Sequence, residues 1–310
     1  MAEIVVVGGT GFIGAAVALQ LVNDGHAVRV YSRSRTRFDQ TFGAHSTIEH
    51  VAGELSDPEA TSAAVAGAEH VLHFASTTNP AASVDAARDD VMSNVLDSLT
   101  LFDACVAASI RRLTFASTGG AIYGHYPGRP LHEDDATMPV SPYAIGKLAT
   151  EGHLRYYHAR HGLQSLALRI SNPYGPRQNA ASGQGVIAAF MDAAREGNPV
   201  TVFGDGGMVR DYLHIDDAAR MIARTVSVDA PHAIVNVGSG VGHSVAEVLS
   251  LVERATGRSI PTDRRPARPS DVPVVVLDTE RYAAAYGSSP TTTLADGIAN
   301  VWVARTAELA

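Results

Sequence analysis

The first half of the chain alternates short runs of β-branched and other apolar residues with longer segments whose apolar residues recur at helical spacing. Runs that are apolar at successive positions predict strands covered on both faces, as in a parallel sheet between two layers of helices. The sequence therefore predicts a doubly wound α/β fold. The expected strands lie at 4–7, 27–31, 47–51, 70–74, 113–116 and 166–170, and the expected helices at 13–24, 84–108 and 142–161.

The regular alternation stops near residue 171. Beyond it, short segments that contain Gly and Pro separate shorter helices, which indicates a second, loop-rich lobe. A chain of 310 residues is long enough for two lobes, since domains commonly span about 100–200 residues. We expect one domain at 1–171 and a smaller one mainly at 172–310, with segments near 208–240 returning to the first.

Composition excludes several classes of function. The formal net charge of −8 disfavours a general affinity for nucleic acid, which a basic patch normally carries. No apolar run approaches the roughly 20 residues that a membrane span requires. Cys105 is the only cysteine, so no intrachain disulfide can form, and a reducing, cytoplasmic setting is expected.

A glycine-rich turn follows the first expected strand. The strand at 4–7 runs directly into Gly-Gly-Thr-Gly-Phe-Ile-Gly at 8–14, which opens the first expected helix. Gly8 would permit the tight turn, Gly11 the close approach of a pyrophosphate, and Gly14 the packing of helix against strand. The helix N-terminus would face the negative charge. The sequence therefore predicts a dinucleotide site on a Rossmann-type fold.

Lysine is almost absent from the chain. Of the 24 basic residues 23 are arginine, and Lys147 is the only lysine. It follows Tyr143 by four residues, so the two side chains would share one face of the helix at 142–161. A nearby ammonium would lower the pKa of Tyr143 and make the phenol a general base for an alcohol proton. The alternative is a chance pairing with a packed aromatic residue.

The glycine spacing together with Tyr-Ala-Ile-Gly-Lys at 143–147 resembles the extended short-chain dehydrogenase/reductase family. The further matches cover nearly the whole chain, and together they are most similar to the nucleotide-sugar 4-epimerase branch. These matches are Phe74-Ala75, Ser117-Thr118, Asn172-Pro173-Tyr174-Gly175-Pro176, Arg210-Asp211-Tyr212, His214 and Asp216-Asp217.

The resemblance implies three catalytic residues. Thr118 would hydrogen-bond the sugar oxygen, with Ser117 as the fallback, Tyr143 would take the proton, and Lys147 would lie beneath Tyr143 and the cofactor ribose. The resemblance also implies cofactor contacts along the glycine turn and after the second, third and fourth strands. The implied cofactor residues are Gly8, Gly11, Phe12, Ile13, Gly14, Ser32, Arg33, Glu54, Leu55, Phe74, Ala75, Ser76, Asn94, Tyr143 and Lys147.

A nucleotide-diphosphate sugar, most commonly a UDP-sugar, is the substrate that the resemblance implies. Arginine forks suit phosphates, so Arg210 and Arg268 would clamp the diphosphate. Alternatively, Arg268 belongs to a solvated charge run and Arg177 serves in its place. Asp271 would bind the ribose. The implied substrate residues are Thr118, Asn172, Val186, Phe203, Arg210, Arg268 and Asp271.

The end of the second expected strand leaves the cofactor open. NAD-selective members of the family carry an acid there, whereas this chain has Ser32 and Arg33. A Ser-Arg pair suits a 2′-phosphate, so NADP is physically reasonable, while the resemblance to epimerases favours NAD. Arg33 could equally be a surface charge. Glu54 also departs from the usual aspartate near the adenine.

The leading hypothesis is an epimerase that oxidises C4 of a UDP-hexose and returns the hydride to the other face of the 4-keto sugar. Gly-Gly-Ala at 119–121 follows Thr118 where related dehydratases carry an acid, which disfavours elimination of water. The alternatives are an NADPH-dependent reductase of a 4-keto sugar, favoured by the Ser-Arg pair, and a non-catalytic dinucleotide sensor. No metal is expected, and the resemblance implies a homodimer formed through the helices at 84–108 and 142–161.

Overall fold

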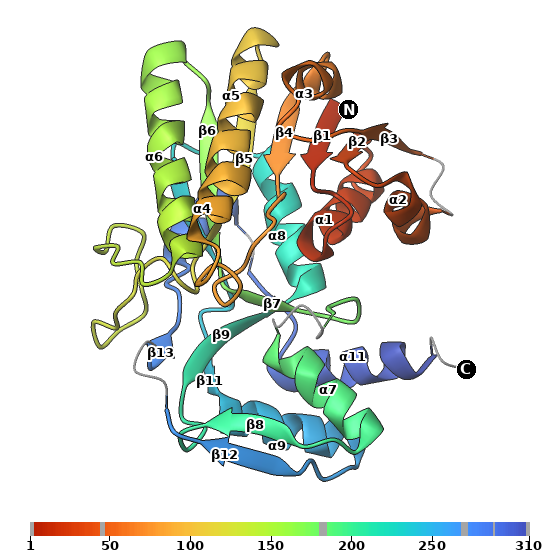
Figure 1. Cartoon of the computed structure of the whole chain (residues 1–310), viewed down its shortest axis with the longest axis vertical. Helices are drawn as coiled ribbons and strands as arrows, with labels where there is room; N and C mark the ends of the chain where they lie inside the picture. The colour runs from red at the N-terminus through yellow and green to blue at the C-terminus, as the bar shows by residue number, and fades with distance from the viewer. Residues whose placement is uncertain (1–2, 44–46, 180–184, 268–271, 288, 308–310) are drawn as a thin grey trace.

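A computed structural model describes residues 3–43, 47–179, 185–267, 272–287 and 289–307, and Figure 1 shows a large sheet with its helices above a smaller lobe. The strands are β1 (Glu3–Val7), β2 (Ala27–Ser32), β3 (Ile48–Ala52), β4 (His70–His73), β5 (Arg112–Thr118), β6 (Ser165–Ile170), β7 (Asn172–Tyr174), β8 (Val200–Phe203), β9 (Val209–His214), β10 (Ile234–Val237), β11 (Gly242–Ser244), β12 (Thr262–Arg265) and β13 (Val274–Val275). The helices are α1 (Phe12–Asn23), α2 (Arg35–Phe42), α3 (Pro58–Val65), α4 (Ala87–Asp90), the π-helical turn η1 (Val91–Leu96), α5 (Asp97–Ala107), α6 (Pro142–His161), α7 (Val186–Glu196), α8 (Ile215–Ser227), α9 (Val245–Thr256), α10 (Glu280–Tyr286) and α11 (Leu294–Ala307).

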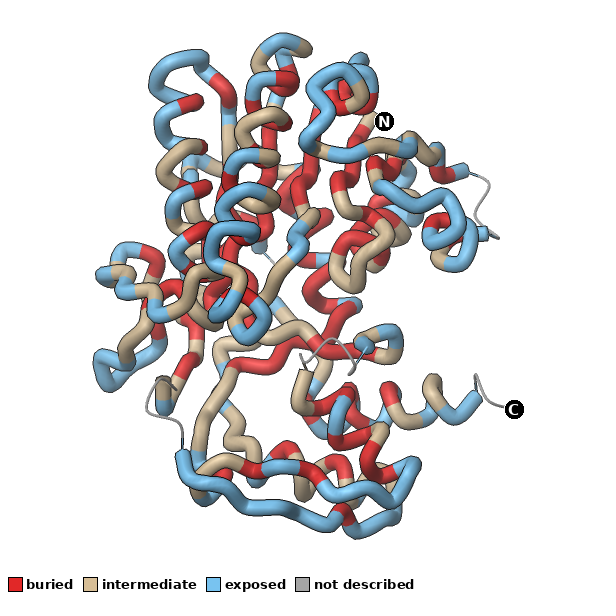
Figure 2. Tube along the Cα trace, viewed as in Figure 1, coloured by how far each residue is buried: buried red, intermediate tan, exposed pale blue. Residues whose placement is uncertain are grey.

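The large sheet has the strand order β10-β6-β5-β4-β1-β2-β3, and all its pairings are parallel. Helices cover both faces, so residues 4–7 of β1 are buried at successive positions, and Figure 2 shows the sheet as the buried centre of its lobe. This confirms the predicted doubly wound fold. The strand order reverses between β1 and β4, and ligands of such folds bind at the carboxyl ends of the strands beside that point.

Two apolar cores hold the helices against the sheet. On one face, α1 and α8 pack together over a core that includes Ile4, Val6 and Ile222. On the other face, α3, α5 and α6 cover a core that includes Val5 and Phe102. Because neighbouring residues of β1 point into different cores, the strand is anchored on both sides. The turn that follows β1 is therefore held in place by both layers.

The helix expected at 84–108 is shorter and less regular than predicted. The N–H groups of Val84 and Ala86 donate to the carbonyls of Ala81 and Ser83, three residues back, which keeps the start of this segment in turns instead of an α-helix. Regular helix begins only at Ala87 and is interrupted by η1 before α5. π-Helical turns of this kind are frequent at functional sites.

Helix α6 begins and ends where the sequence predicts. The Ser141 side chain accepts from the Ala144 N–H, and Pro142 occupies the first turn. Gly162 ends the helix in the left-handed conformation, with φ of +73°. Both ends are set by residues that adjoin the helix in sequence. Both ends of α6 can therefore be predicted from the sequence alone.

The smaller lobe contains β8, β12, α7, α9 and α11 around a core of its own (Figure 1). Two elements of the second half nevertheless join the large sheet, since β10 pairs with β6 and α8 packs against α1. The division into domains at residue 171 stays a prediction. Among the residues that the structure describes, no helix is both long and apolar enough to cross a membrane.

Candidate active site

The glycine turn after β1 has no room for larger residues at two positions. Gly8 has φ of +76°, and a Cβ there would lie 2.6 Å from the backbone N of Ala75. A Cβ at Gly14 would lie 2.6 Å from the carbonyl oxygen of Gly8. The turn therefore lies directly against the segment that follows β4. This brings Phe74 and Ala75 beside the glycine turn, as the sequence analysis expected.

The N-terminus of α1 faces this turn without a protein cap. Gly11 occupies the capping position, no side chain accepts from the first turn, and no acidic residue lies in that turn. The N–H groups at the start of the helix, including those of Phe12 and Ile13, carry the positive end of the helix dipole. A cradle of glycine backbone beside an uncapped helix N-terminus fits the pyrophosphate of a dinucleotide.

We expect Gly14→Ala to lower both stability and cofactor affinity. The added methyl would overlap the Gly8 carbonyl and force α1 away from the turn, at a cost of about 1–3 kcal/mol. Gly152→Ala in α6 is the matched control, because its Cβ would meet only a side-chain atom of Arg155 at 3.7 Å. The control should be neutral or slightly stabilising. Urea unfolding and dinucleotide titration would measure both effects, and equal behaviour of the two variants would contradict this packing.

Tyr143 and Lys147 come together on the face of α6 that lies against β5. The Lys147 ammonium is buried, donates to the Ala116 carbonyl at 2.8 Å, and lies 4.6 Å from the centroid of the Phe115 ring. Its distance to the centroid of the half-buried Tyr143 ring is 5.6 Å. The pair is thus held at the carboxyl end of β5, near the switch point of the sheet.

The expected direction of the Tyr143 pKa shift is wrong for this structure. Burial raises the pKa of Tyr143 to about 12, and the negative charge of Asp90 adds to this. Burial also lowers the pKa of Lys147 to about 8, against the opposing charges of Asp90 and Glu151. The ammonium donates to a backbone carbonyl of β5, so desolvation of the phenol dominates.

The two hydroxyl residues that end β5 have different surroundings. The Ser117 hydroxyl donates to Glu151 at 2.6 Å, and Glu151 in turn accepts two hydrogen bonds from Arg169, at 2.8 and 3.1 Å. The Ser117 hydroxyl is therefore already hydrogen-bonded to a buried ion pair. Successive side chains of a strand point to opposite faces, so Thr118 is directed elsewhere. A Cβ at Gly120 would lie 3.9 Å from the Thr118 hydroxyl oxygen and 3.5 Å from the Asn172 side chain.

Asn94 lies within η1 and joins it to the segment after β4. Its side-chain oxygen accepts from the Thr77 N–H at 3.0 Å, and its amide donates to Thr78 at 2.8 Å and to Asp90 at 2.9 Å. Ser76, in the same segment, is exposed and donates to the Thr78 carbonyl. Asn94 thus ties the π-helical turn to the segment that follows β4.

The end of β2 is polar and open. The Ser32 hydroxyl lies 3.0 Å from Nε2 of His50, while Arg33 is exposed. The Glu54 side chain is also exposed, and its backbone carbonyl accepts from the Tyr31 phenol at 2.8 Å. Leu55 packs against the core beneath. No acid follows β2 directly, so the position where NAD-selective members of the family carry an acid is occupied here by Ser32 and Arg33.

Apart from Thr118 at the end of β5, the described residues implied for substrate binding come from four elements. Asn172 begins β7 and donates to the Asp211 carbonyl at 3.0 Å. Arg210 in β9 donates to the Val209 carbonyl at 2.8 Å, Val186 begins α7, and Phe203 ends β8. Figure 1 shows these strands and α7 below the large sheet. The remaining two implied residues, Arg268 and Asp271, lie outside the residues that the structure describes.

A model of the NAD-dependent epimerase/dehydratase family matches residues 4–238, which include the glycine turn, Thr118, Tyr143 and Lys147. The chain belongs to this family. The UDP-glucose 4-epimerase of Mycolicibacterium smegmatis is 33% identical over 298 residues, which are 95% of each chain. The family assignment confirms the resemblance to the extended short-chain dehydrogenase/reductases.

Solved structures of other members have the same architecture throughout. UDP-glucose 4-epimerase from Thermotoga maritima, solved with UDP-glucose, gives a TM-score of 0.93 at 30% identity and covers 99% of this chain and 100% of that one. The Thermus thermophilus UDP-glucose 4-epimerase complex with NAD gives 0.90 at 33% identity, covering 98% and 99%. The epimerase/dehydratase fold therefore extends over both lobes.

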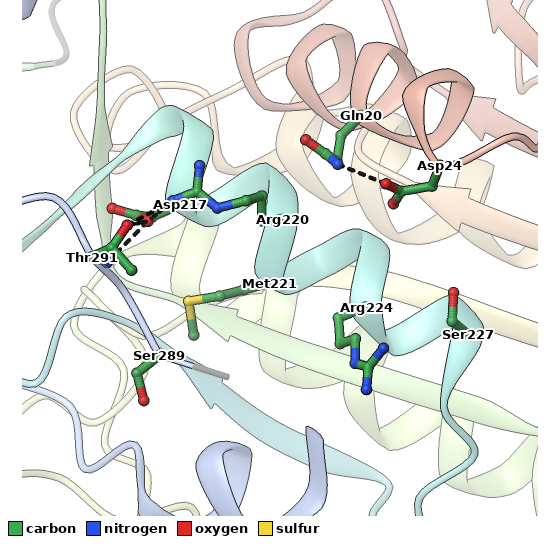
Figure 3. A pocket seen from close by; sticks show the side chains of 9 residues that line it. All are labelled: Gln20, Asp24, Asp217, Arg220, Met221, Arg224, Ser227, Ser289 and Thr291. Carbon is green, nitrogen blue, oxygen red and sulfur yellow. Dashed lines mark hydrogen bonds and ion pairs between the residues drawn. The ribbon is translucent and has the colours of Figure 1, made fainter. Parts of the chain in front are cut away.

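A separate pocket of about 440 Å³ lies between α1, α8 and residues 289–291 (Figure 3). Its arginines are already engaged, because Arg220 pairs with Asp217 and donates to Thr291, while Arg224 donates to the Tyr286 carbonyl. None of the catalytic candidates lines it. Within the described part of the chain, no group of three potential metal ligands is found either.

Sequence reasoning missed one residue of this site. Asp90 is fully buried and accepts hydrogen bonds from Thr78 and Asn94. An acid inside a helix expected to be amphipathic gives no sign that it is buried, because most such acids face solvent. One sequence feature could have indicated its place in the site: Asp90 lies four residues before Asn94, and residues four apart share a helix face.

Proposed function

We propose that this protein is a UDP-hexose 4-epimerase with a tightly held NAD. The observation that supports the proposal is that Lys147 donates to Ala116 of β5 and lies close to Tyr143, while Thr118 ends the same strand. Family membership and the similarity of both lobes to UDP-glucose 4-epimerases support a nucleotide-sugar substrate. Asn172 and Arg210 would contact the nucleotide from the smaller lobe.

Each catalytic residue then has one task. Tyr143 takes the proton of the C4 hydroxyl and later returns it, and the Thr118 hydroxyl orients the same oxygen by a hydrogen bond. Lys147 gives one of its three N–H groups to Ala116, which leaves two for the cofactor ribose. When bound, the oxidised nicotinamide supplies a hydride acceptor and a positive charge. The high pKa of Tyr143 means that its proton is released readily only when positive charge adjoins the phenol.

The surroundings of Thr118 favour epimerisation over loss of water. Elimination needs a local acid, and the residues at 119–121 are Gly-Gly-Ala. A Cβ at Gly119 would lie 2.5 Å from the Leu277 side chain, so that position has no room for a carboxylic acid. With Tyr143 as the proton carrier and no acid at positions 119–121, one carbon is oxidised and reduced again.

The proposal is tested by identifying the nucleotide that the purified protein releases when it is denatured. Released NAD, with interconversion of UDP-glucose and UDP-galactose in the absence of added cofactor, is the expected result. A protein that releases no nucleotide and consumes NADPH with a 4-keto sugar would instead be a reductase. Ser32 and the exposed Arg33 are the specific observation that favours this second candidate.

We further propose that the enzyme is a homodimer formed through η1, α5 and α6. Large apolar side chains are exposed on η1 and α6, among them Met92 at 54%, Ile145 at 54% and Tyr156 at 57%. Exposed apolar residues that gather on one face are typical of protein interfaces.

We expect Ile145→Asp to weaken the dimer about tenfold or more, because a carboxylate would be buried without a partner. Val303→Asp on α11 is the matched control, since Val303 is also exposed, at 65%, but lies on another element. Sedimentation velocity over a concentration series would measure the dissociation. An unchanged dimer in Ile145→Asp would place the interface elsewhere.

The location that we propose is the cytoplasm. The single cysteine, Cys105, is buried, and burial raises the pKa of its thiol to about 12, so it is poorly reactive. A chain with this cysteine usage is suited to a reducing compartment. Fractionation of the source cells with an antibody to the protein would test the location.

A further inference from the structure

Asp90 is a buried carboxylate that lies against the catalytic helix. Its side chain is fully buried, and its Oδ1 accepts from the Thr78 hydroxyl and from the Asn94 amide. Its Oδ2 has no hydrogen-bond partner within the described ranges. A Cβ at Gly146 would lie 2.7 Å from that oxygen. Asp90 therefore packs against the backbone of α6 between Tyr143 and Lys147.

Asp90 provides the counter-charge for the buried ammonium of Lys147. The charged or titratable neighbours of the ammonium in the described part of the chain are Asp90 from α4, Tyr143 and Glu151 from α6, and His73 from β4. Glu151 is already neutralised by Arg169, which binds both of its oxygens. Burial lowers the pKa of His73 to about 3, so this side chain is neutral at ordinary pH.

The hydrogen-bond partners that the described residues offer Asp90 are neutral, namely the Thr78 hydroxyl and the Asn94 amide. Among these neighbours of Lys147, Asp90 is therefore the carboxylate whose negative charge is not compensated by an arginine. A buried carboxylate and a buried ammonium stabilise each other because water screens them poorly.

We propose that Asp90 is a positioning residue that keeps Lys147 protonated and ties η1 to the segment after β4. The inference rests on the proposed function, in which Lys147 serves as an ammonium that binds the cofactor ribose. Asp90 does this without touching the substrate. The same carboxylate explains why position 146 is glycine, since any side chain there would displace it.

The charge of Asp90 also acts on the proton carrier. It raises the pKa of Tyr143 and the pKa of Lys147 together. Loss of the charge would lower both values. Activity that needs a deprotonated Tyr143 and a protonated Lys147 would then shift to lower pH at both limits of the profile.

The test uses the fact that Lys147 is the only lysine. Protein labelled with lysine carrying ¹³C at the ε position, without a lysine-containing tag, gives one side-chain NMR signal, whose shift follows the protonation of this residue. We expect the titration midpoint of Asp90→Asn to lie below that of the wild type by about one pH unit or more. The matched control is Asp89→Asn, which removes the same charge from the exposed neighbouring position and should leave the midpoint unchanged.

A second variant covers the case in which Asp90→Asn does not fold. Gly146→Ala keeps every charge but pushes the Asp90 carboxylate away, so the midpoint should again fall, by a smaller amount. Gly152→Ala on the same helix is its control. Equal midpoints in Asp90→Asn and Asp89→Asn, or in Gly146→Ala and Gly152→Ala, would overturn the proposal.

The NMR titration needs neither substrate nor cofactor, so it separates the two proposals. A wild-type protein that fails to interconvert UDP-hexoses would count against the proposed function alone. With an active enzyme, the pH profile of kcat/KM provides a second readout. If Asp90 has only a structural role, Asp90→Asn should lower kcat/KM by the same factor at every pH. If Asp90 keeps Lys147 protonated, Asp90→Asn should move the alkaline limit of the profile to lower pH.

Discussion

Tyr143→Phe is expected to lower the turnover of UDP-glucose by about 10²-fold or more while substrate and cofactor still bind. The change removes one oxygen from a half-buried ring and leaves the ring's packing in place. General acid-base groups typically contribute 10²–10⁴-fold to a rate. Steady-state assays with UDP-glucose would measure the turnover, and calorimetric titration with UDP would measure the binding.

Tyr156→Phe is the matched control for this experiment. Tyr156 lies on the same helix, 13 positions after Tyr143, but its side chain is exposed. The control should retain full turnover. Near-normal turnover in Tyr143→Phe would remove this residue from the mechanism, and equal losses in both variants would point to damage to α6 instead of lost chemistry.

Glu151→Ala is expected to lower the free energy of unfolding by about 3–5 kcal/mol. The ion pair of Glu151 with Arg169 is almost completely buried, and removal of one partner would leave the other charge without compensation. The Ser117 hydroxyl would also lose its acceptor. Urea or guanidinium unfolding followed by circular dichroism would measure the change.

The control for this prediction is an exposed ion pair. Asp39→Ala breaks the surface pair with Arg35 and should change stability by about 0.5 kcal/mol or less. Replacing both Glu151 and Arg169 by apolar residues of similar volume should recover much of the loss, because no uncompensated charge is then buried. A loss in Glu151→Ala no larger than that in Asp39→Ala would show that this pair does not stabilise the protein.

These predictions connect the stability of the fold to its chemistry. The Glu151–Arg169 pair neutralises a carboxylate one helical turn from Lys147 and commits Ser117 to the core. Thr118 is then the strand-end hydroxyl that the proposed mechanism assigns to the substrate. The ion pair and helix α6 therefore belong to one network, in which Arg169 neutralises the Glu151 carboxylate near Lys147.

The sequence by itself determined the elements whose causes are local. Helix α6 runs over the predicted residues because Ser141, Pro142 and Gly162 adjoin its ends. The parallel strands were recognisable because burial on both faces demands apolar residues at successive positions. The glycine turn was recognisable because its spacing reflects one continuous strand-turn-helix unit.

Only the tertiary structure decided the features that depend on residues far apart in the chain. The segment before α4 is a turn, and η1 follows it, within a region whose composition suits one long helix. Glu151, 34 positions away in the chain, accepts a hydrogen bond from Ser117 and so rules this hydroxyl out as the substrate-binding candidate. The direction of the Tyr143 pKa shift depends on burial and on the charge of Asp90. The physical reason is that hydrogen-bond partners, desolvation and charge compensation are set by which side chains meet in space, and packing alone determines that.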